Sequence, residues 1–252
     1  MQRTVEVNST VSRIVSLVPS QTELLVDLGL REKLVGVTKF CIHPTELRRE
    51  VQQIGGTKNA KIDRIRSLKP DLIIGNKEEN NRADIEALEK EFPVWMSDVF
   101  NLEDALDMLM RIGELTGTEA KALELKESII QNFDQLKTLK STGKSVLYLI
   151  WKDPYIAAGK NTFIDSMLKT LGFENAVSEE RYPEAVLETL VPDYIFLSSE
   201  PYPFKEKHLE ALQEQFPASK IILVDGEYFS WYGSRLLGAP AYFLKLLNLL
   251  HN

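Results

Sequence analysis

Two stretches that read almost alike, LKPDLII at residues 68–74 and LVPDYIF at 190–196, decide the fold class. In each, a helix end is followed by a Pro-Asp break and then by an apolar run with the length of a buried strand. Proline cannot continue a helix, and short, continuously apolar runs are typical of parallel strands that are covered on both faces. The repeat therefore predicts a chain built from two similar α/β halves.

The first half opens on an apolar strand, predicted over 13–18, which Pro19 ends. Ser20 and Glu23 follow with the S-x-x-E spacing of a capping box, so we expect them to start a helix. That helix is predicted to end at Gly29, because glycine is the usual residue just beyond a helix. A further strand is predicted over 34–38.

The second half repeats this order. An apolar strand is predicted over 145–150, and Thr162 and Asp165 form a second capping pair at the start of a helix that ends at Gly172. Strands that alternate with helices predict parallel sheets flanked by helices. We therefore expect an α/β fold of two lobes, each with a central, mostly parallel sheet.

A helical stripe lies between the halves, over residues 118–140, with charged residues on the opposite face. Its apolar positions are Ala122, Leu125, Ile129, Phe133, Leu136 and Leu139. A helix of about 22 residues spans roughly 33 Å and is a stiff connector. The pattern predicts an N-terminal α/β lobe over 1–116, a rigid connecting helix over 117–141 and a C-terminal α/β lobe over 142–252.

The composition excludes several classes of function. A formal net charge of -7 argues against nucleic acid or an anionic membrane as the main partner. No run of 18 apolar residues is present, and the single Cys41 leaves no pair for an internal disulfide. The chain lacks the G-x-S-x-G, P-loop and H-E-x-x-H motifs, which favours a binding protein without a catalytic cofactor over an enzyme.

Ligands of open α/β sheets bind at the carboxyl ends of the strands, and two facing lobes would bring both sets of loops to one cleft. The loops at those ends are rich in aromatic residues, which bury a large area at low entropic cost. Arg235, at the start of the last helix, is placed either to hold a carboxylate or phosphate or to form a salt bridge. The predicted ligand-binding residues are Ser20, Gln21, Phe40, His43, Asn76, Trp151, Tyr155, Tyr228, Trp231, Tyr232 and Arg235. Trp95, inside an apolar strand, is predicted to be core.

Cys41 and His43 place a thiol and an imidazole two residues apart. Either side chain is able to ligate zinc, haem iron or cobalt. A closed zinc site needs four ligands, so the alternative is a hydrogen-bonding His43 in the pocket wall and a small, buried Cys41.

Six stretches together form a family pattern: RIVSLVPSQTELL at 13–25, VGVT at 35–38, IGGTKN at 54–59, IRSLKPDLIIGN at 65–76, PYIAAGK at 154–160 and the aromatic loop before Ser234-Arg235-Leu236. In these motifs the chain resembles the periplasmic substrate-binding proteins of iron-siderophore, haem and cobalamin ABC transporters, nearest the cobalamin-binding branch. The resemblance implies two lobes, a helical backbone and a metal chelate (cobalamin or another corrinoid, haem or a ferric siderophore) held between them. Phe40 stands where the cobalamin branch has a pocket tyrosine.

The resemblance also implies a monomer that docks on an ABC permease dimer through acidic residues at the lobe tips. Glu78, Glu79 and Glu206 are the candidates here, with Arg82 where the first acid is expected. A periplasmic or extracytoplasmic location is implied. The N-terminus has no apolar leader segment, so a cytosolic chelate carrier or sensor on the same fold is the alternative. A metal-dependent enzyme, motivated by Cys41 and His43, is the third.

Overall fold

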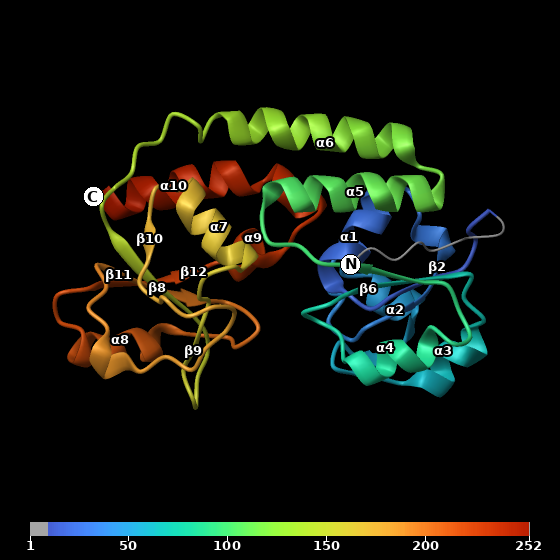
Figure 1. The fold of residues 1–252 in the computed structure, drawn as a ribbon, viewed down its shortest axis with the longest axis horizontal. Coiled ribbons are helices and arrows are strands. Elements are labelled where there is room, and N and C mark those ends of the chain that lie inside the picture. Colours follow the sequence, from blue (N-terminus) through green and yellow to red (C-terminus); the bar gives the residue numbers. More distant parts are fainter. Residues whose placement is uncertain (1–9, 252) are drawn as a thin grey trace. The chain divides into compact units, whose positions relative to one another are not determined.

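The structure, a computed structural model, describes residues 10–251 and divides the chain into two compact units (Figure 1). The first unit runs to Val99 and also contains Glu103–Ile129 and Tyr232–Arg235. The second contains Phe100–Leu102, Ile130–Trp231 and the chain from Leu236 onward. Each unit thus includes a short segment that is flanked in sequence by the other.

The first unit is an α/β layer structure whose elements alternate along the chain. Its strands and helices are β1 (Ile14–Ser16), α1 (Pro19–Asp27), η1 (Arg31–Lys33), β2 (Leu34–Val37), α2 (Leu47–Glu50), β3 (Gln52–Gln53), β4 (Gly55–Gly56), β5 (Asn59–Ala60), α3 (Ile62–Leu68), β6 (Leu72–Asn76), α4 (Arg82–Leu88), β7 (Val94–Ser97) and α5 (Leu102–Thr116).

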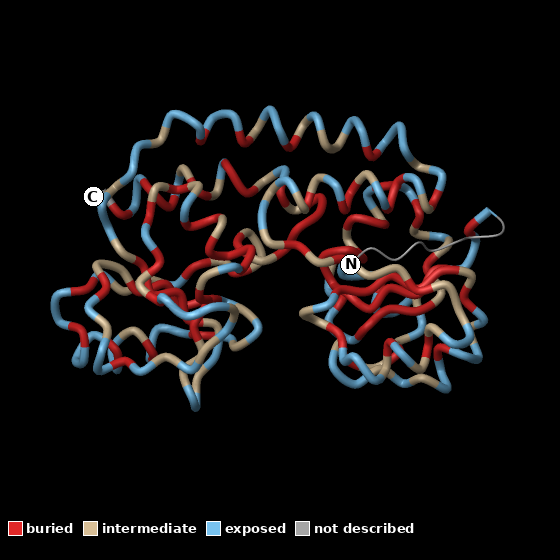
Figure 2. Tube along the Cα trace, viewed as in Figure 1, coloured by how far each residue is buried: buried red, intermediate tan, exposed pale blue. Residues whose placement is uncertain are grey.

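The central sheet of this unit has the strand order β3-β2-β1-β6-β7, and all its pairs are parallel. Successive side chains of a strand point to opposite faces. Val15 and Ile73 accordingly pack with Ile65 and Leu88 under helices α3 and α4, while α1 and α5 lie on the other side (Figure 1). Figure 2 shows the strands buried between these layers, as the apolar runs predicted.

The start of α1 differs from the prediction of a Ser20–Glu23 capping box. The helix begins at Pro19 with Val18 as its N-cap, and no side chain caps it. Proline at the first helical position fixes a helical φ, so the helix starts before Ser20, which then lies inside the first turn. Glu23 binds Arg235 instead of the backbone.

The second unit repeats the plan. Its elements are β8 (Ser145–Trp151), β9 (Ile156–Ala157), α7 (Phe163–Thr170), β10 (Glu174–Asn175), η2 (Leu187–Thr189), β11 (Tyr194–Ser198), α8 (Glu206–Gln215), β12 (Lys220–Val224), α9 (Gly226–Ser230), η3 (Ser234–Leu237, which starts in the segment assigned to the first unit) and α10 (Ala239–His251).

Its sheet has the order β10-β8-β11-β12 with parallel pairs, and β9 runs antiparallel to β8. Leu149 and Leu197 pack against Leu212 of α8 on one face. On the other face Tyr148 lies against Phe229 of α9, with ring centroids 5.1 Å apart. The predicted α/β fold with parallel sheets is confirmed.

The repeated Pro-Asp pair has the same structural role in both units. Asp71 accepts hydrogen bonds from the backbone N–H groups of Ser12 (2.9 Å) and Arg13 (2.9 Å), at the start of β1. Asp193 accepts from the backbone N–H of Ser145 (2.9 Å), at the start of β8. Each aspartate thus ties the amino ends of two neighbouring strands together, which explains why the two stretches read alike.

Helix α6 (Glu119–Asp134) contains the first four positions of the predicted apolar stripe, from Ala122 to Phe133, and it contributes residues to both units, which divide it after Ile129. It is shorter than the predicted 117–141. Beyond Asp134 the backbone bonds contract to the i→i−3 type, as in Leu136 N–H to the Phe133 carbonyl at 2.9 Å. Ile129, Phe133 and Leu136 are buried as expected.

None of the helices over residues 10–251 is both long and apolar enough to cross a membrane.

Candidate functional site

Each unit has a candidate site of its own, formed by the loops at the carboxyl ends of its parallel strands. In the first unit these loops follow β1, β2 and β6, and they hold the predicted residues Ser20 to Glu79. In the second unit they follow β8, β11 and β12, and they hold those from Trp151 to Trp231. Tyr232 and Arg235 belong to the first unit.

Ser20 and Gln21 are buried in the first turn of α1. The Gln21 amide donates to Ser97 Oγ and to Met108 Sδ (3.4 Å), so this side chain joins α1 to β7 and α5. The Ser20 hydroxyl has no hydrogen-bond partner among the described residues. Their role as ligand contacts stays a prediction.

The loop after β2 presents one exposed and one buried side chain of the predicted set. Phe40 is 48% exposed, while Cys41 is fully buried with its Sγ 3.1 Å from Thr22 Oγ1 and 3.2 Å from Thr38 Oγ1. Burial raises the pKa of the Cys41 thiol above its ordinary value. A thiol with this pKa and no access to solvent is a poor thiolate ligand.

His43 is half-buried and lies close enough to Glu23 for its charge to affect that carboxyl. Within the part of the chain that the structure describes, no group of three or more His, Cys, Asp or Glu side chains is arranged to hold a metal ion. Metal ligation by Cys41 and His43 stays a prediction.

The loop after β6 is organised by amide side chains. Asn76 Oδ1 accepts the backbone N–H groups of Glu78 (2.8 Å) and Glu79 (3.2 Å), which fixes the turn that holds both glutamates. Asn76 itself is buried, and its Nδ2 donates to Ser97 Oγ at 3.0 Å. Asn80, which sequence reasoning missed, bonds to the backbone N–H of Asn76 (2.8 Å).

The segment Tyr232–Arg235 packs on α1 and on the β6 loop. Tyr232 donates its hydroxyl to Glu79 Oε1 (3.2 Å), and the Arg235 guanidinium binds Glu23 through two bonds of 3.1 and 2.7 Å. Burial raises the pKa of Glu23, and Arg235 and then His43 oppose that rise. Of the two alternatives open for Arg235, the structure contains the salt bridge.

In the second unit, Trp151 ends β8 and is 44% exposed. Its ring meets Tyr202 edge-on, with centroids 5.7 Å apart, and Tyr202 in turn meets His208 at 5.6 Å. Tyr155 is half-buried against the core under α8. Tyr202 was missed, although it lies just beyond strand β11, where the strand-end rule would have found it.

The loop after β12 places its aromatic residues in different environments. Tyr228 stacks on Tyr242 at 4.7 Å, and Trp231 is buried with its Nε1 donating to Glu200 Oε1 at 2.9 Å. Ser230 Oγ donates to the same Glu200 oxygen at 2.5 Å. Burial raises the pKa of Glu200 above its ordinary value. Glu200 was not among the predicted site residues.

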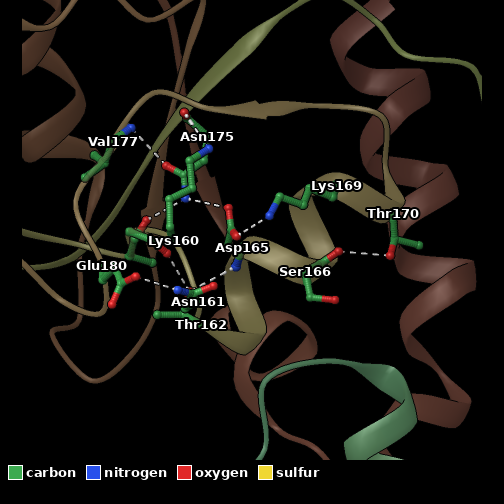
Figure 3. A network of polar contacts seen from close by, with 12 residues as sticks. Lys160, Asn161, Thr162, Asp165, Ser166, Lys169, Thr170, Asn175, Val177 and Glu180 are labelled. Atoms are coloured by element: carbon green, nitrogen blue, oxygen red, sulfur yellow. Dashed lines mark hydrogen bonds and ion pairs between the residues drawn. The ribbon is translucent and has the colours of Figure 1, made fainter.

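A buried polar network supports the loop between β9 and α7 (Figure 3). Thr162 caps α7 as predicted, accepting from the backbone N–H of Asp165 at 3.1 Å. The Asp165 carboxylate does not bond back to the cap; it accepts from Lys169 (2.6 Å) and Asn175 (3.0 Å). The network therefore ties α7 to β10 and holds the loop that carries the predicted PYIAAGK motif.

Glu206, the predicted docking acid of the second half, is exposed in the first turn of α8. Glu78 and Glu79 are half-buried. Docking by all three stays a prediction.

Comparison with known proteins gives several matches. The chain is similar to an ABC transporter substrate-binding lipoprotein of Bacillus subtilis, 32% identical over 179 residues, or 67% of this chain and 56% of that protein. The chain therefore spans just over half the length of that relative. A vitamin B12-binding protein of Pectobacterium carotovorum is 26% identical over 240 residues, 89% of this chain and 84% of that protein.

The crystal structure of the periplasmic vitamin B12 binding protein of Vibrio cholerae superposes with a TM-score of 0.80 at 20% identity, over 96% of this chain and 99% of that one. At this identity the match shows a shared fold only. The model of the periplasmic binding protein family matches residues 14–220. The chain belongs to the periplasmic binding protein family.

Proposed function

We propose that this chain is the solute-binding component of an ABC importer and that it captures a corrinoid of the vitamin B12 class. The observation that carries the proposal is the exposed Trp151 ring at the carboxyl end of β8, in a chain with relatives named for vitamin B12. Haem and ferric siderophores are the other chelates that the fold family suggests, and they enter the test as competitors.

Trp151 suits a large, partly flat ligand. The residue is 44% exposed, and the edge-on contact with Tyr202 restrains the indole before a ligand arrives. A rigid aromatic surface loses little conformational entropy on binding, and an aromatic contact adds about 0.5–1.5 kcal/mol beyond the buried area. This chemistry favours a macrocyclic chelate over a small polar solute.

The test is isothermal titration of the protein with cyanocobalamin, dicyanocobinamide, haemin and ferrichrome, followed in parallel by tryptophan fluorescence. We expect micromolar or tighter binding of the two corrinoids. Trp151→Ala should weaken it by about tenfold or more, since losing 1.4 kcal/mol of contact costs that factor. Trp95→Phe, in β7 of the other unit, is the matched control and should bind normally. If only haemin or ferrichrome binds, that chelate is the ligand class in place of a corrinoid. If none of the four chelates binds, the proposal is refuted.

The same proposal places the protein outside the cytoplasm with an ABC permease dimer as its partner, and as a monomer before docking. Glu206 supports this because it is exposed in the first turn of α8. Charge reversal of Glu206 should weaken permease binding in a pull-down, whereas reversal of Glu174, exposed at the amino end of β10, should not. Recovery of the native protein in the cytosolic fraction would favour the carrier or sensor instead.

A further inference from the structure

Asn80 joins three segments at the carboxyl edge of the first sheet. Its Nδ2 donates to the backbone carbonyl oxygens of Leu17 (3.2 Å), at the end of β1, and of Thr57 (3.1 Å), in the β4–β5 hairpin. Its Oδ1 accepts the backbone N–H of Asn76 (2.8 Å), at the end of β6. The residue is 7% exposed, and both its amide hydrogens are used.

The surrounding contacts extend this arrangement to the loop surface. Asn76 Oδ1 fixes the turn at Glu78 and Glu79, and Lys58 Nζ of the hairpin donates to the Glu78 carbonyl. Gly75 leaves the space that Asn80 occupies, since a Cβ atom there would come within 2.7 Å of Asn80 Oδ1. Asn80 therefore holds the hairpin and the β6 loop to one another and to the end of β1, and Lys58 adds a second link between the hairpin and the loop.

We propose that Asn80 is the positioning residue of the ligand-binding edge of the first unit: it holds the β4–β5 hairpin and the β6 loop in their binding geometry before ligand arrives. The inference rests on the proposed function, because it assumes that this edge meets the captured ligand. Asn80 acts through the backbone of its neighbours. Its chemistry requires an amide, with two donors toward carbonyl oxygens and one acceptor toward an N–H.

A matched control exists in the same unit. Asp71 joins the same two strands, β1 and β6, at their amino ends, through Ser12 and Arg13. Asp71→Ala removes a comparable set of backbone contacts at the opposite edge of the sheet. Asn80→Asp keeps the size of the side chain and the acceptor for Asn76, but it replaces the Nδ2 group, which donates both hydrogen bonds, by an oxygen that faces two carbonyl oxygens. Gly75→Ala crowds the same side chain by a different route, together with Met96, whose Sδ is also 2.7 Å from the added Cβ.

The experiment combines titration with cyanocobalamin and hydrogen exchange of the ligand-free protein. We expect Asn80→Ala, Asn80→Asp and Gly75→Ala each to weaken cyanocobalamin binding by about tenfold, because ordering one freed backbone residue on binding costs that factor. Exchange should quicken at 55–59 and 76–79 in these variants. Asp71→Ala should lower the melting temperature while leaving affinity and exchange at those residues unchanged.

Equal affinity losses in Asn80→Ala and Asp71→Ala would reduce Asn80 to a general stabilising residue and overturn the proposal. So would normal binding by Asn80→Asp, since space filling alone would then suffice. If the unaltered protein binds none of the four chelates, the proposed function fails. In that case hydrogen exchange by itself tests the role of Asn80. Amides at 55–59 that stay protected in Asn80→Ala would overturn the role, and fast exchange confined to the two loops would support it.

Discussion

Removal of Arg235 tests the partly buried ion pair that holds the segment Tyr232–Arg235 to α1. The side chains of Arg235 and Glu23 are each 17% exposed. An exposed ion pair contributes about 0–1 kcal/mol, whereas breaking a fully buried one by removing a partner costs about 3–5 kcal/mol. Arg235→Met should therefore lower the free energy of unfolding by about 2 kcal/mol, which is about 4–8 °C in melting temperature for a chain of this size.

The loss of stability in Arg235→Met should depend on pH. Burial raises the pKa of Glu23 above its ordinary value of 4.5, and Arg235 opposes that rise. Without Arg235 the pKa rises further, so the stability that this carboxyl contributes is present below pH 4.5 and lost as the pH climbs through the folded pKa. The deficit of Arg235→Met should be larger at pH 7.5 than at pH 4.5.

Thermal unfolding at both pH values is the assay. A deficit that does not change with pH, or one below about 0.5 kcal/mol, would refute the reasoning. Two controls sharpen it. Glu23→Gln/Arg235→Met should recover part of the loss, since an amide replaces the stranded charge. Arg82→Met, which breaks the exposed pair with Glu86, should leave the melting temperature unchanged.

Three further outcomes are expected. The pKa of Asp193 is lowered to about 2, chiefly by the hydrogen bond that it accepts from Lys144. The stability that this carboxylate contributes is therefore present above the ordinary pKa of 3.8 and is lost as the pH falls toward 2. Asp193→Asn should make the free energy of unfolding less dependent on pH in that window, and an unchanged acid unfolding profile would contradict this. Cys41 should react with a thiol reagent only in denaturant, and rapid labelling of the folded protein would be the contrary result. In chemical unfolding, Phe229→Ala should lower the free energy of unfolding by about 3–5 kcal/mol, because this side chain is fully buried. Phe40→Ala, at 48% exposure, should lower it far less, and equal losses in the two variants would contradict the difference in burial.

Much of the fold followed from local patterns. The Pro-Asp repeat predicted two α/β halves because proline ends a helix and a strand of apolar residues must be covered on both faces. The resemblance to the binding-protein family is confirmed by the match over residues 14–220, and with it the prediction of a binding protein in place of an enzyme. Thr162 was predicted as a cap because capping depends on residues three positions apart.

The parts that failed or were missed depend on contacts far apart in sequence. Ser20 and Glu23 have the spacing of a capping box, but Pro19 starts the helix early and Arg235, 212 residues away, takes the carboxylate. Trp95, predicted as core, is only half-buried on β7. No local pattern distinguishes Asn80, whose partners come from three segments of the fold.

Each unit contains a short segment that is flanked in sequence by the other unit, and this limits how the chain can be cut into separately expressed fragments. Phe100–Leu102 belongs with the second unit and Tyr232–Arg235 with the first. A stop codon after α6 would remove the residues that bind Glu23 and Glu79, and a start codon after it would remove Phe100, whose ring lies 5.1 Å from the Arg181 guanidinium. No single cut of the polypeptide therefore yields either unit whole, so complementary fragments of this protein should recover their native contacts only when they are produced together.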